Sequence, residues 1–277
     1  MEYAPKYSLV MIEQRNHHIE KNNGGVEQFS FEKWHPSAID DIDRLEKMCW
    51  PPWLQYPRQH LETISERFSN TQLLARNKNN VVVGAITANR IDWDGNPDSL
   101  TTWDDVAGGV VGIGDYTATY KPEGNAICVM SASVDPTAQR ASIGRRLVEG
   151  TIGLAKEAGA EYLIGPFRPS GYGEYKRLHG QIPFSDYCNL KRDNELHDPW
   201  LRSVSRLGMI PLRVENESMR VDVSRQQFDE YRRTFQPDKW QHARGNIWEC
   251  GETGSWIVSN DRATYIEPNL WGRIPLP

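Results

Sequence analysis

The clearest chemical signal in the sequence is a short loop between a strand-like run and a helical pattern. Residues 125–134 are mostly aliphatic or small and are closed by Asp135-Pro136. Over residues 143–158 apolar side chains recur at helical spacing, and Gly159 stands where a C-terminal cap belongs. A helix that starts after small residues presents unpaired backbone N–H groups and the positive end of its dipole, which together bind anions. The pattern indicates an anion site.

Arginines add positive charge to this loop and to the helical segment after it. Arg140 lies in the loop, and Arg145 and Arg146 follow on the helix. Their charge attracts the same anions as the helix dipole does. From composition alone, a capped surface helix with solvated arginines explains these residues equally well.

The order of these features resembles the GNAT superfamily of acyl-CoA-dependent N-acyltransferases. In that family a strand ends in V-x-P, and a loop Q/R-x-x-G-x-G/A opens a long helix and holds the coenzyme A pyrophosphate. This chain has Val134 and Pro136, followed by Gln139-Arg140-Ala141-Ser142-Ile143-Gly144. Ser142 stands at the family's first glycine, where phosphate approaches the backbone; serine is small and can donate a hydrogen bond.

The resemblance implies a cofactor site for acetyl-CoA or another acyl-CoA, used as co-substrate without a metal. Strands 125–134 and 161–164 would splay apart, and the backbone of Ser133 and Val134 would pair with the pantetheine arm as an added strand does. The pyrophosphate would lie on the loop and the helix start, which comprise Gln139, Arg140, Ala141, Ser142, Ile143, Gly144 and Arg145.

The resemblance also implies a tyrosine acid for the departing thiolate, because many GNAT enzymes carry one on the helix after the strand that corresponds to 161–164. Tyr175 has the closer spacing, and Tyr172 is the second candidate. Rings that only pack under a loop are the alternative. For the base, His179 or Glu174 lies nearby, and the sequence assigns neither.

A second, weaker resemblance is to GNAT-like domains of amidohydrolase fusions and polyketide loading modules. It rests on the segments 168–172 (RPSGY) and 197–202 (HDPWLR). It implies a malonyl-CoA-type decarboxylase and S-acyltransferase acting on a carrier-protein thiol. Arg168 would then bind a substrate carboxylate, and a structural arginine is the alternative. A third hypothesis is an acyl-CoA-binding module without turnover.

The remaining elements must position this loop. The sequence predicts a strand at 29–34, helices at 38–48 and 60–68, a hairpin of 71–76 and 81–90, and a long irregular connection at 92–124 that is the first candidate for substrate contact. After the strand 161–164 we expect a turn-rich stretch at 166–183, helices at 197–208 and 224–235, a strand at 212–223, and Trp-bearing strands within 246–274.

This order predicts an α/β (α+β) fold of GNAT type, a mixed central sheet flanked by helices. We expect a flexible leader at 1–28 and one domain at 29–277, with the insertion 92–124 and a Trp-rich C-terminal extension at 224–277. The excess length over a core of about 150 residues is then the expected source of acceptor specificity.

The composition of the chain narrows the classes of partner that it is expected to bind. The net charge is −5, which disfavours nucleic acid and anionic membranes. The four cysteines are dispersed and no metal-ligand spacing occurs. No signal peptide or long apolar run is found, so we expect a cytoplasmic protein. The expected partner is a small-molecule acceptor, or an acyl carrier protein in the second hypothesis, and a homodimer is one open oligomeric state.

Overall fold

A computed structural model describes residues 19–20, 26–27, 29–108, 114–138 and 142–277 of the chain. Within the predicted leader, only β1 (Ile19–Glu20) and β2 (Val26–Glu27) are described, and they pair antiparallel. The first part of the fold contains β3 (Ser30–Lys33), α1 (Ile39–Cys49), α2 (Arg58–Arg67), β4 (Leu73–Arg76), β5 (Val82–Ile91), α3 (Trp103–Ala107), β6 (Ala126–Val134), α4 (Ile143–Glu157) and β7 (Tyr162–Phe167).

The second part runs to the C-terminus. It contains α5 (Tyr172–His179), α6 (Phe184–Asn189), β8 (Lys191–Arg192), β9 (Glu195–Leu196), α7 (Pro199–Ser205), β10 (Ile210–Ser224), α8 (Arg225–Thr234), β11 (Gln241–Arg244), β12 (Ile247–Glu249), β13 (Ser255–Val258) and β14 (Arg262–Ile274). The stretch 166–183, predicted as turns, therefore contains α5. A Gly-rich start hid this helix from the sequence pattern, because glycine has a low helix propensity.

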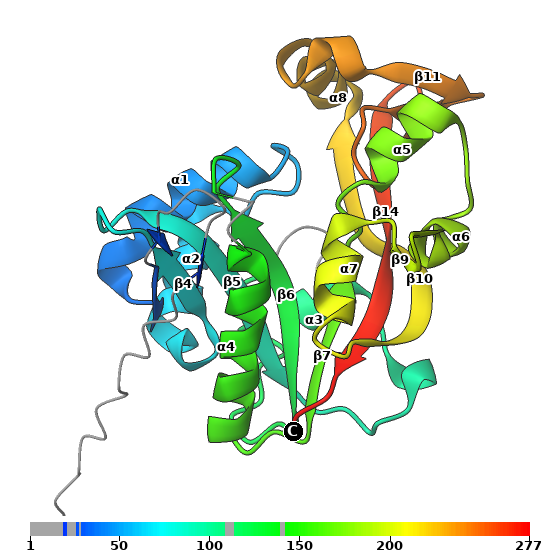
Figure 1. The fold of residues 1–277 in the computed structure, drawn as a ribbon. Helices are drawn as coiled ribbons and strands as arrows, with labels where there is room; N and C mark the ends of the chain where they lie inside the picture. Colours follow the sequence, from blue (N-terminus) through cyan, green and yellow to red (C-terminus); the bar gives the residue numbers. More distant parts are fainter. Residues whose placement is uncertain (1–18, 21–25, 28, 109–113, 139–141) are drawn as a thin grey trace, which may run out of the picture.

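Ten strands of the described chain form one mixed sheet, in the order β11-β12-β13-β14-β7-β6-β5-β4-β3, and β10 pairs with β14 beside this path. All printed pairings in the sheet are antiparallel except β6 with β7. The predicted mixed sheet flanked by helices is confirmed (Figure 1).

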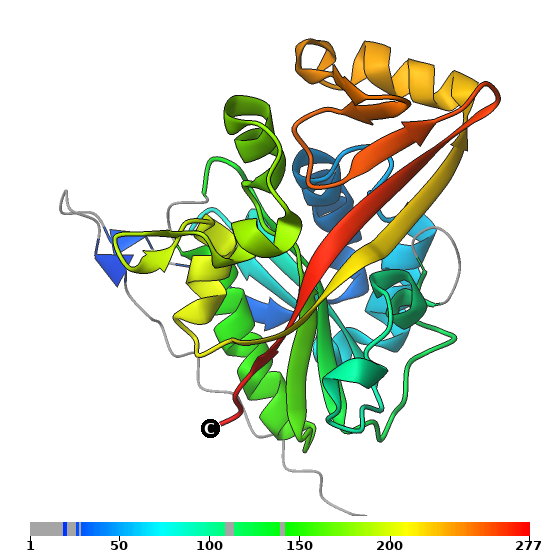
Figure 2. The same cartoon turned by 90° about the vertical axis from the view of Figure 1, so that its right-hand side faces the viewer.

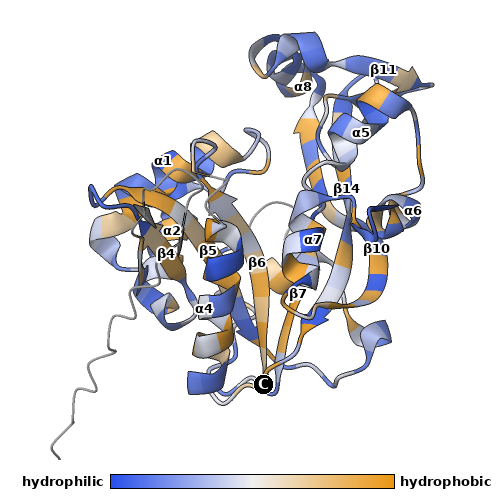
Figure 3. Ribbon diagram, in the orientation of Figure 1, coloured by the Kyte–Doolittle hydropathy of each residue, from blue (hydrophilic) through white to orange (hydrophobic). Residues whose placement is uncertain are grey.

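Successive side chains along a strand point to opposite faces of the sheet. In the central strands successive residues are hydrophobic, so both faces of the sheet are hydrophobic there. On β6, Cys128 and Met130 belong to the cluster beneath α1 and α2, whereas Ile127 and Val129 belong to the cluster beneath α4. Figure 3 shows this hydrophobic character along β5, β6 and β7, and a hydrophilic α8. No described helix is long and apolar enough to span a membrane.

The strands β6 and β7 pair only at their beginnings. Their parallel ladder joins residues 126–128 to residues 162–164, whereas β6 keeps its antiparallel partner β5 as far as Val134. Beyond Cys128 the side of β6 that faces β7 therefore has no strand partner. The predicted splay of these two strands is present.

The C-terminal part continues the sheet through the long antiparallel pair of β10 and β14. One end of β14 pairs with β7 at residues 270–274, and its other end pairs with β13 at residues 263–266. Figure 2 shows β10 and β14 side by side, with α8 near their far end. The extension thus lies against the core at the place where β7 separates from β6.

An aromatic cluster holds this C-terminal part against the loop after α1. Trp53, which is 5% exposed, comes from the Pro-Pro turn that ends α1. Its indole has ring contacts with centroid distances between 5.1 and 5.9 Å to Tyr231, Phe235, Trp240, Trp256 and Tyr265. Such contacts combine a large buried area with favourable tilted ring geometry.

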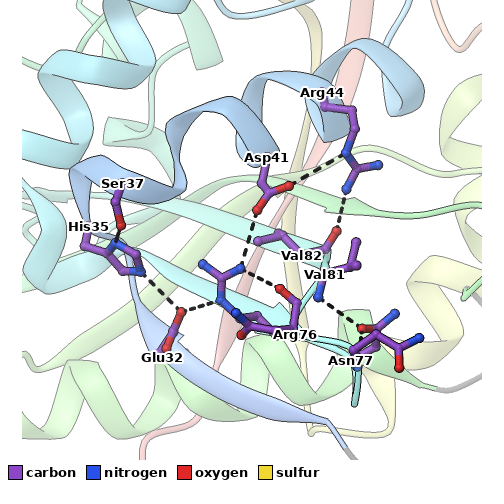
Figure 4. A network of polar contacts seen from close by, with 11 residues as sticks. Glu32, His35, Ser37, Asp41, Arg44, Arg76, Asn77, Val81 and Val82 are labelled. Atoms are coloured by element: carbon purple, nitrogen blue, oxygen red, sulfur yellow. Dashed lines mark hydrogen bonds and ion pairs between the residues drawn. The ribbon is translucent and has the colours of Figure 1, made fainter.

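A polar network anchors α1 on the opposite edge of the sheet (Figure 4). Arg76 of β4 donates to Glu32 at 2.7 Å and to the carbonyl of Asn80 at 2.9 Å, and it pairs with Asp41 of α1 at 3.4 Å. Arg44 of the same helix donates to the carbonyl of Val82 at 2.8 Å. Helix α1 is therefore tied to β3, β4 and β5, which fixes the side chains that it presents at its C-terminal end.

Candidate active site

A small cavity, partly open to solvent, lies where β6 and β7 separate. Met130 and Ser131 of β6 form one part of its wall, and Pro166 of β7 and the following Arg168 form another. Its position beside the partner-free side of β6 makes it the candidate site for an acyl group and a small acceptor.

The rest of the wall comes from segments that are distant in the sequence. Helix α1 and its following loop contribute Glu46, Trp50, Leu54 and Tyr56. The insertion contributes Trp103, and the long C-terminal pair contributes Met219 from β10 and Asn269 from β14. Both parts of the chain that were expected to carry acceptor specificity thus reach the cavity.

Glu46 is the acidic side chain with the clearest chemical role in this wall. It is 5% exposed; its Oε1 accepts the backbone N–H of Tyr56 at 3.2 Å, and its Oε2 accepts the Ser133 hydroxyl at 3.5 Å. Burial raises the pKa of Glu46 to about 8, although both hydrogen bonds oppose the shift. A carboxyl group that ionises near neutral pH is suited to accept a proton in catalysis.

The sequence analysis missed Glu46, and one signal pointed to it. Residue 46 lies four positions after Ile42 and directly after Leu45, so the helical period places it next to the buried face of α1. An acidic residue in that position needs partners inside the protein. Only the fold shows that these partners belong to the loop and to β6.

A chain of buried hydroxyl groups supports the same wall. The Tyr56 and Tyr116 hydroxyls are 2.7 Å apart, Tyr116 donates to Thr87 at 2.9 Å, and Thr87 donates to Ser131 at 3.1 Å. Tyr116 comes from the insertion and adopts φ 68°, a left-handed conformation that non-glycine residues rarely adopt. The insertion therefore fixes Tyr56 and Ser131, which both line the cavity.

Arg168 lies at the cavity as predicted, but its guanidinium is already engaged. Nε donates to Glu267 at 2.8 Å and Nη2 to Glu252 at 2.6 Å, and the group lies 5.3 Å from the Trp50 ring centroid. One cationic side chain thus faces two acidic ones. The predicted role of Arg168 in binding a substrate carboxylate remains a prediction, and the ion pairs show that it also has a structural role.

The two candidate tyrosine acids lie on α5, outside the cavity wall. The Tyr172 hydroxyl donates to the carbonyl of Ile182 at 2.9 Å. The Tyr175 ring packs against Tyr187 at 5.2 Å and His197 at 5.6 Å. The helix follows β7 as the resemblance implies, but the structure does not bring either hydroxyl to Glu46. Their catalytic roles stay predictions.

The predicted coenzyme loop is described only in part. Gln139, Arg140 and Ala141 lie outside the described residues. Ser142 precedes α4 at φ 57°, a conformation that favours glycine, and its side chain makes no capping hydrogen bond. A left-handed backbone at residue 142 is expected for a position at which the resembling family usually has glycine.

The start of α4 is packed against the second part of the chain. Ile143 is buried, and the hydrogen side of Gly144 faces Trp200 of α7, whose nearest atom would be 3.2 Å from an added Cβ. Arg145 lies 3.4 Å from Glu149 on the same helix. Ser142, Ile143, Gly144 and Arg145 thus lie at the N-terminus of a 15-residue helix, and their binding of a pyrophosphate stays a prediction.

The two β6 residues predicted to bind pantetheine lie beside the cavity wall. Ser133 accepts a hydrogen bond from the Trp50 indole N–H at 2.7 Å, and the Val134 carbonyl accepts a long contact of 3.4 Å from the Cys49 thiol. Within the described residues, no group of three or more His, Cys, Asp or Glu side chains could hold a metal ion.

Comparisons with known proteins agree with this architecture. The family model for the acetyltransferase (GNAT) family matches residues 39–167. The probable hydrolase YhcX of Bacillus subtilis is 25% identical over 64% of this chain and 32% of its own length. The arginine N-acetyltransferase avaD of Aspergillus versicolor is 24% identical over 58% of this chain and 59% of its own. The chain thus spans about a third of the length of the first relative and about three fifths of the length of the second.

Solved structures show the same fold. The loading GNATL domain of CurA from Lyngbya majuscula superposes with a TM-score of 0.60 at 15% identity, covering 90% of this chain and 98% of that one. The GphF GNAT-like decarboxylase, solved with isobutyryl-CoA, has a TM-score of 0.55 at 24% identity, covering 68% and 89%. With β6, β7 and α4 arranged as described, residues 39–167 match the model of the acetyltransferase (GNAT) family, and the chain has the GNAT fold.

Proposed function

We propose that this protein transfers a short acyl group, most simply acetyl, from coenzyme A to the amine of a small molecule by direct attack. The observation that carries the proposal is Glu46, a buried carboxyl group that lines the cavity and has its pKa raised to about 8 by burial. A base of this pKa can accept a proton from an ammonium ion near neutral pH.

The coenzyme side of the proposal rests on β6 and α4. Along an antiparallel strand the hydrogen-bonding groups alternate in direction, so part of the β6 backbone after Cys128 faces away from β5 and toward the gap. An extended pantetheine arm can pair with these groups as a strand does. The N-terminus of α4 then supports the pyrophosphate.

The reaction balances with groups on the protein and the two substrates. Ionised Glu46 takes a proton from the ammonium, and the neutral nitrogen attacks the thioester carbonyl carbon. As the C–S bond breaks, the attacking nitrogen, which has become cationic, releases its second proton to solvent, and the thiolate leaves and takes up a proton. Tyr175 is the candidate donor of that proton. The products are an amide and free coenzyme A.

The charge around the cavity favours a cationic acceptor. Arg168 is offset by the two acidic side chains of Glu252 and Glu267. Glu46 adds a third acidic group, and Trp50, Tyr56 and Trp103 supply aromatic surface in the same wall. An ammonium group is compatible with both features.

A direct test measures binding and turnover separately. Calorimetry with acetyl-CoA, malonyl-CoA and free coenzyme A reports the coenzyme site, and thiol release with a panel of small amines reports transfer. Acetyl-CoA binding with amine-dependent thiol release supports the proposal. Tight binding without turnover of any acceptor indicates a binding module, and no binding of any of the three ligands contradicts the proposal.

A second candidate is decarboxylation of malonyl-CoA with transfer of the acetyl group to a carrier-protein thiol. The position of Arg168 at the cavity favours it, because a guanidinium can bind a carboxylate in a bidentate manner. The solved structure of GphF is named a GNAT-like decarboxylase. Release of carbon dioxide from malonyl-CoA distinguishes this reaction from acyl transfer to an amine. We rank this candidate second because the guanidinium of Arg168 already forms two ion pairs within the protein.

A further inference from the structure

Asn269 of β14 lines the cavity, and its side chain carries an acceptor atom that has no hydrogen bond. Its side chain is 1% exposed, and its Oδ1 is buried without a partner among the described residues. Buried polar atoms are nearly always hydrogen-bonded, and an unsatisfied one is costly. An unpaired acceptor in the wall of a cavity therefore indicates a ligand that donates.

The orientation of this amide is determined by its surroundings. Nδ2 donates to the Pro268 carbonyl at 2.8 Å and to Glu267 Oε1 at 3.3 Å. A flipped amide would place Oδ1 against these two oxygen atoms, neither of which can donate as a carbonyl or a carboxylate. The unpaired atom of the Asn269 side chain is thus the oxygen.

Glu267 holds the amide rigidly. This carboxyl group is 0% exposed; its Oε2 accepts the Tyr265 hydroxyl at 2.6 Å, and its Oε1 accepts Arg168 Nε at 2.8 Å. A fully bonded buried group of this kind has one orientation. Asn269 therefore presents Oδ1 without an entropic cost when a ligand binds.

We propose that Asn269 is a specificity residue for the acyl acceptor: its Oδ1 accepts an N–H hydrogen bond from the amine while Glu46 accepts the proton that is lost. This inference rests on the proposed N-acyl transfer. An amine that satisfies both groups needs at least two N–H bonds in its ammonium form. Small primary and secondary amines therefore meet this requirement, and tertiary amines do not.

The variant Asn269→Leu removes the acceptor atom and keeps a similar volume. We expect the KM for a small primary amine to rise about 10- to 100-fold, in line with a hydrogen bond to a charged group. The affinity for acetyl-CoA should change less than about threefold. Asn269→Asp keeps Oδ1 and, when protonated, can donate to Glu267 in place of Nδ2, so it should restore part of the amine affinity.

Asn89 provides a matched control. It is also fully buried with an unpaired Oδ1, but it lies on β5 and does not line the cavity. Asn89→Leu should lower the melting temperature as Asn269→Leu does. Its KM for a small primary amine should stay within about threefold of the wild-type value, whereas Asn269→Leu should raise that KM. A KM that stays at the wild-type value in both variants overturns the inference.

A binding measurement separates this inference from the proposed function. Thermal shifts with free coenzyme A plus a primary amine report acceptor binding without turnover. If the amine stabilises the wild type and Asn269→Asp but not Asn269→Leu, the inference is supported even when no amine is acylated, a result that overturns only the proposed function. Equal stabilisation of all variants, or none of the wild type, overturns the inference.

Discussion

The Ser133 hydroxyl lies 3.5 Å from Oε2 of Glu46 and links the candidate base to the strand expected to hold the coenzyme. The same hydroxyl accepts the Trp50 indole N–H at 2.7 Å, so its position is fixed from the α1 side. A side chain of β6 therefore helps to orient a carboxyl group of α1. The candidate base Glu46 and the strand β6, which is expected to hold the coenzyme, are therefore positioned by the same contacts.

The variant Glu46→Gln should lose most of the activity. Loss of a positioned general base lowers kcat/KM by about 10²- to 10⁴-fold, whereas acetyl-CoA affinity should stay within a few-fold because the amide preserves shape. The wild-type kcat/KM should rise with pH and level off above about 8, as Glu46 ionises. Steady-state kinetics from pH 6 to 9 measures both effects.

The exposed Glu62 of α2, which pairs with Arg58, is the control for this experiment. Glu62→Gln should keep both the rate and the pH profile. If Glu46→Gln retains the wild-type rate and profile, Glu46 is not the base.

The stability of the protein should also depend on Glu46. Its pKa is raised from the ordinary value of 4.5 to about 8, so the folded state holds a proton that the unfolded state has released between these values. The stabilisation is complete below about pH 4.5 and is lost as the pH rises through about 8. The difference is on the order of a few kcal/mol.

Glu46→Gln has no such proton, so its melting temperature relative to the wild type should increase from pH 5 to about pH 8 and change little above that. Thermal denaturation at four pH values in this range tests the trend. A difference in melting temperature that does not change with pH would show that the Glu46 carboxyl group is ionised over the whole range from pH 5 to pH 9.

The buried ion pair of Lys176 and Glu249 should be sensitive to removal of one partner. Nζ and Oε1 are 2.7 Å apart, and the two residues are 5% and 4% exposed. Lys176→Met or Glu249→Gln alone should cost about 3–5 kcal/mol, because each leaves a buried charge uncompensated. The double variant should recover a large part of that loss, as urea denaturation can measure.

The exposed pair of Arg206 and Glu195 is the control, with a 2.7 Å contact in solvent. Arg206→Met should cost less than about 1 kcal/mol. If the free-energy losses of the two single variants at Lys176 and Glu249 simply add in the double variant, the two charged groups do not stabilise one another.

Trp53 should be a main contributor to the attachment of the C-terminal part. Trp53→Ala removes a buried ring with five aromatic neighbours and should cost about 3–5 kcal/mol. Trp53→Phe should cost much less, because the indole N–H has no hydrogen-bond partner among the described residues. The exposed Ile257→Ala should change the free energy of unfolding by less than about 0.5 kcal/mol. Equal losses for the two Trp53 variants would refute this ring-packing explanation.

Ser142→Gly should relieve the left-handed backbone before α4. At φ 57° a residue with a Cβ is strained, so glycine should stabilise the protein by about 0.5–1 kcal/mol. Acetyl-CoA affinity should be kept or improved, because the backbone becomes more accessible to phosphate. Ser142→Ala retains the strain and should not stabilise; equal stability of the two variants would argue against strain at this position.

Local sequence signals predicted the regular middle of the protein well. The apolar period of residues 143–158 corresponds to α4, and the Asp198-Pro199 pair corresponds to the start of α7, where Asp198 accepts the backbone N–H groups of Trp200 and Leu201. Both depend on interactions within one or two helical turns. Such interactions are encoded by neighbouring residues and can be read from them.

By itself, then, the sequence determined the order of elements in the regular middle of the chain and the position of the loop predicted to hold the coenzyme, because periodicity and caps are local. Only the tertiary structure decided the composition of the cavity. Glu46, Arg168 and Asn269 are separated by more than 100 residues in sequence, and β14 brings Asn269 beside β7 through strand pairing. The raised pKa of Glu46 and the unpaired Oδ1 of Asn269 both arise from burial among these distant segments, a property of the assembled fold.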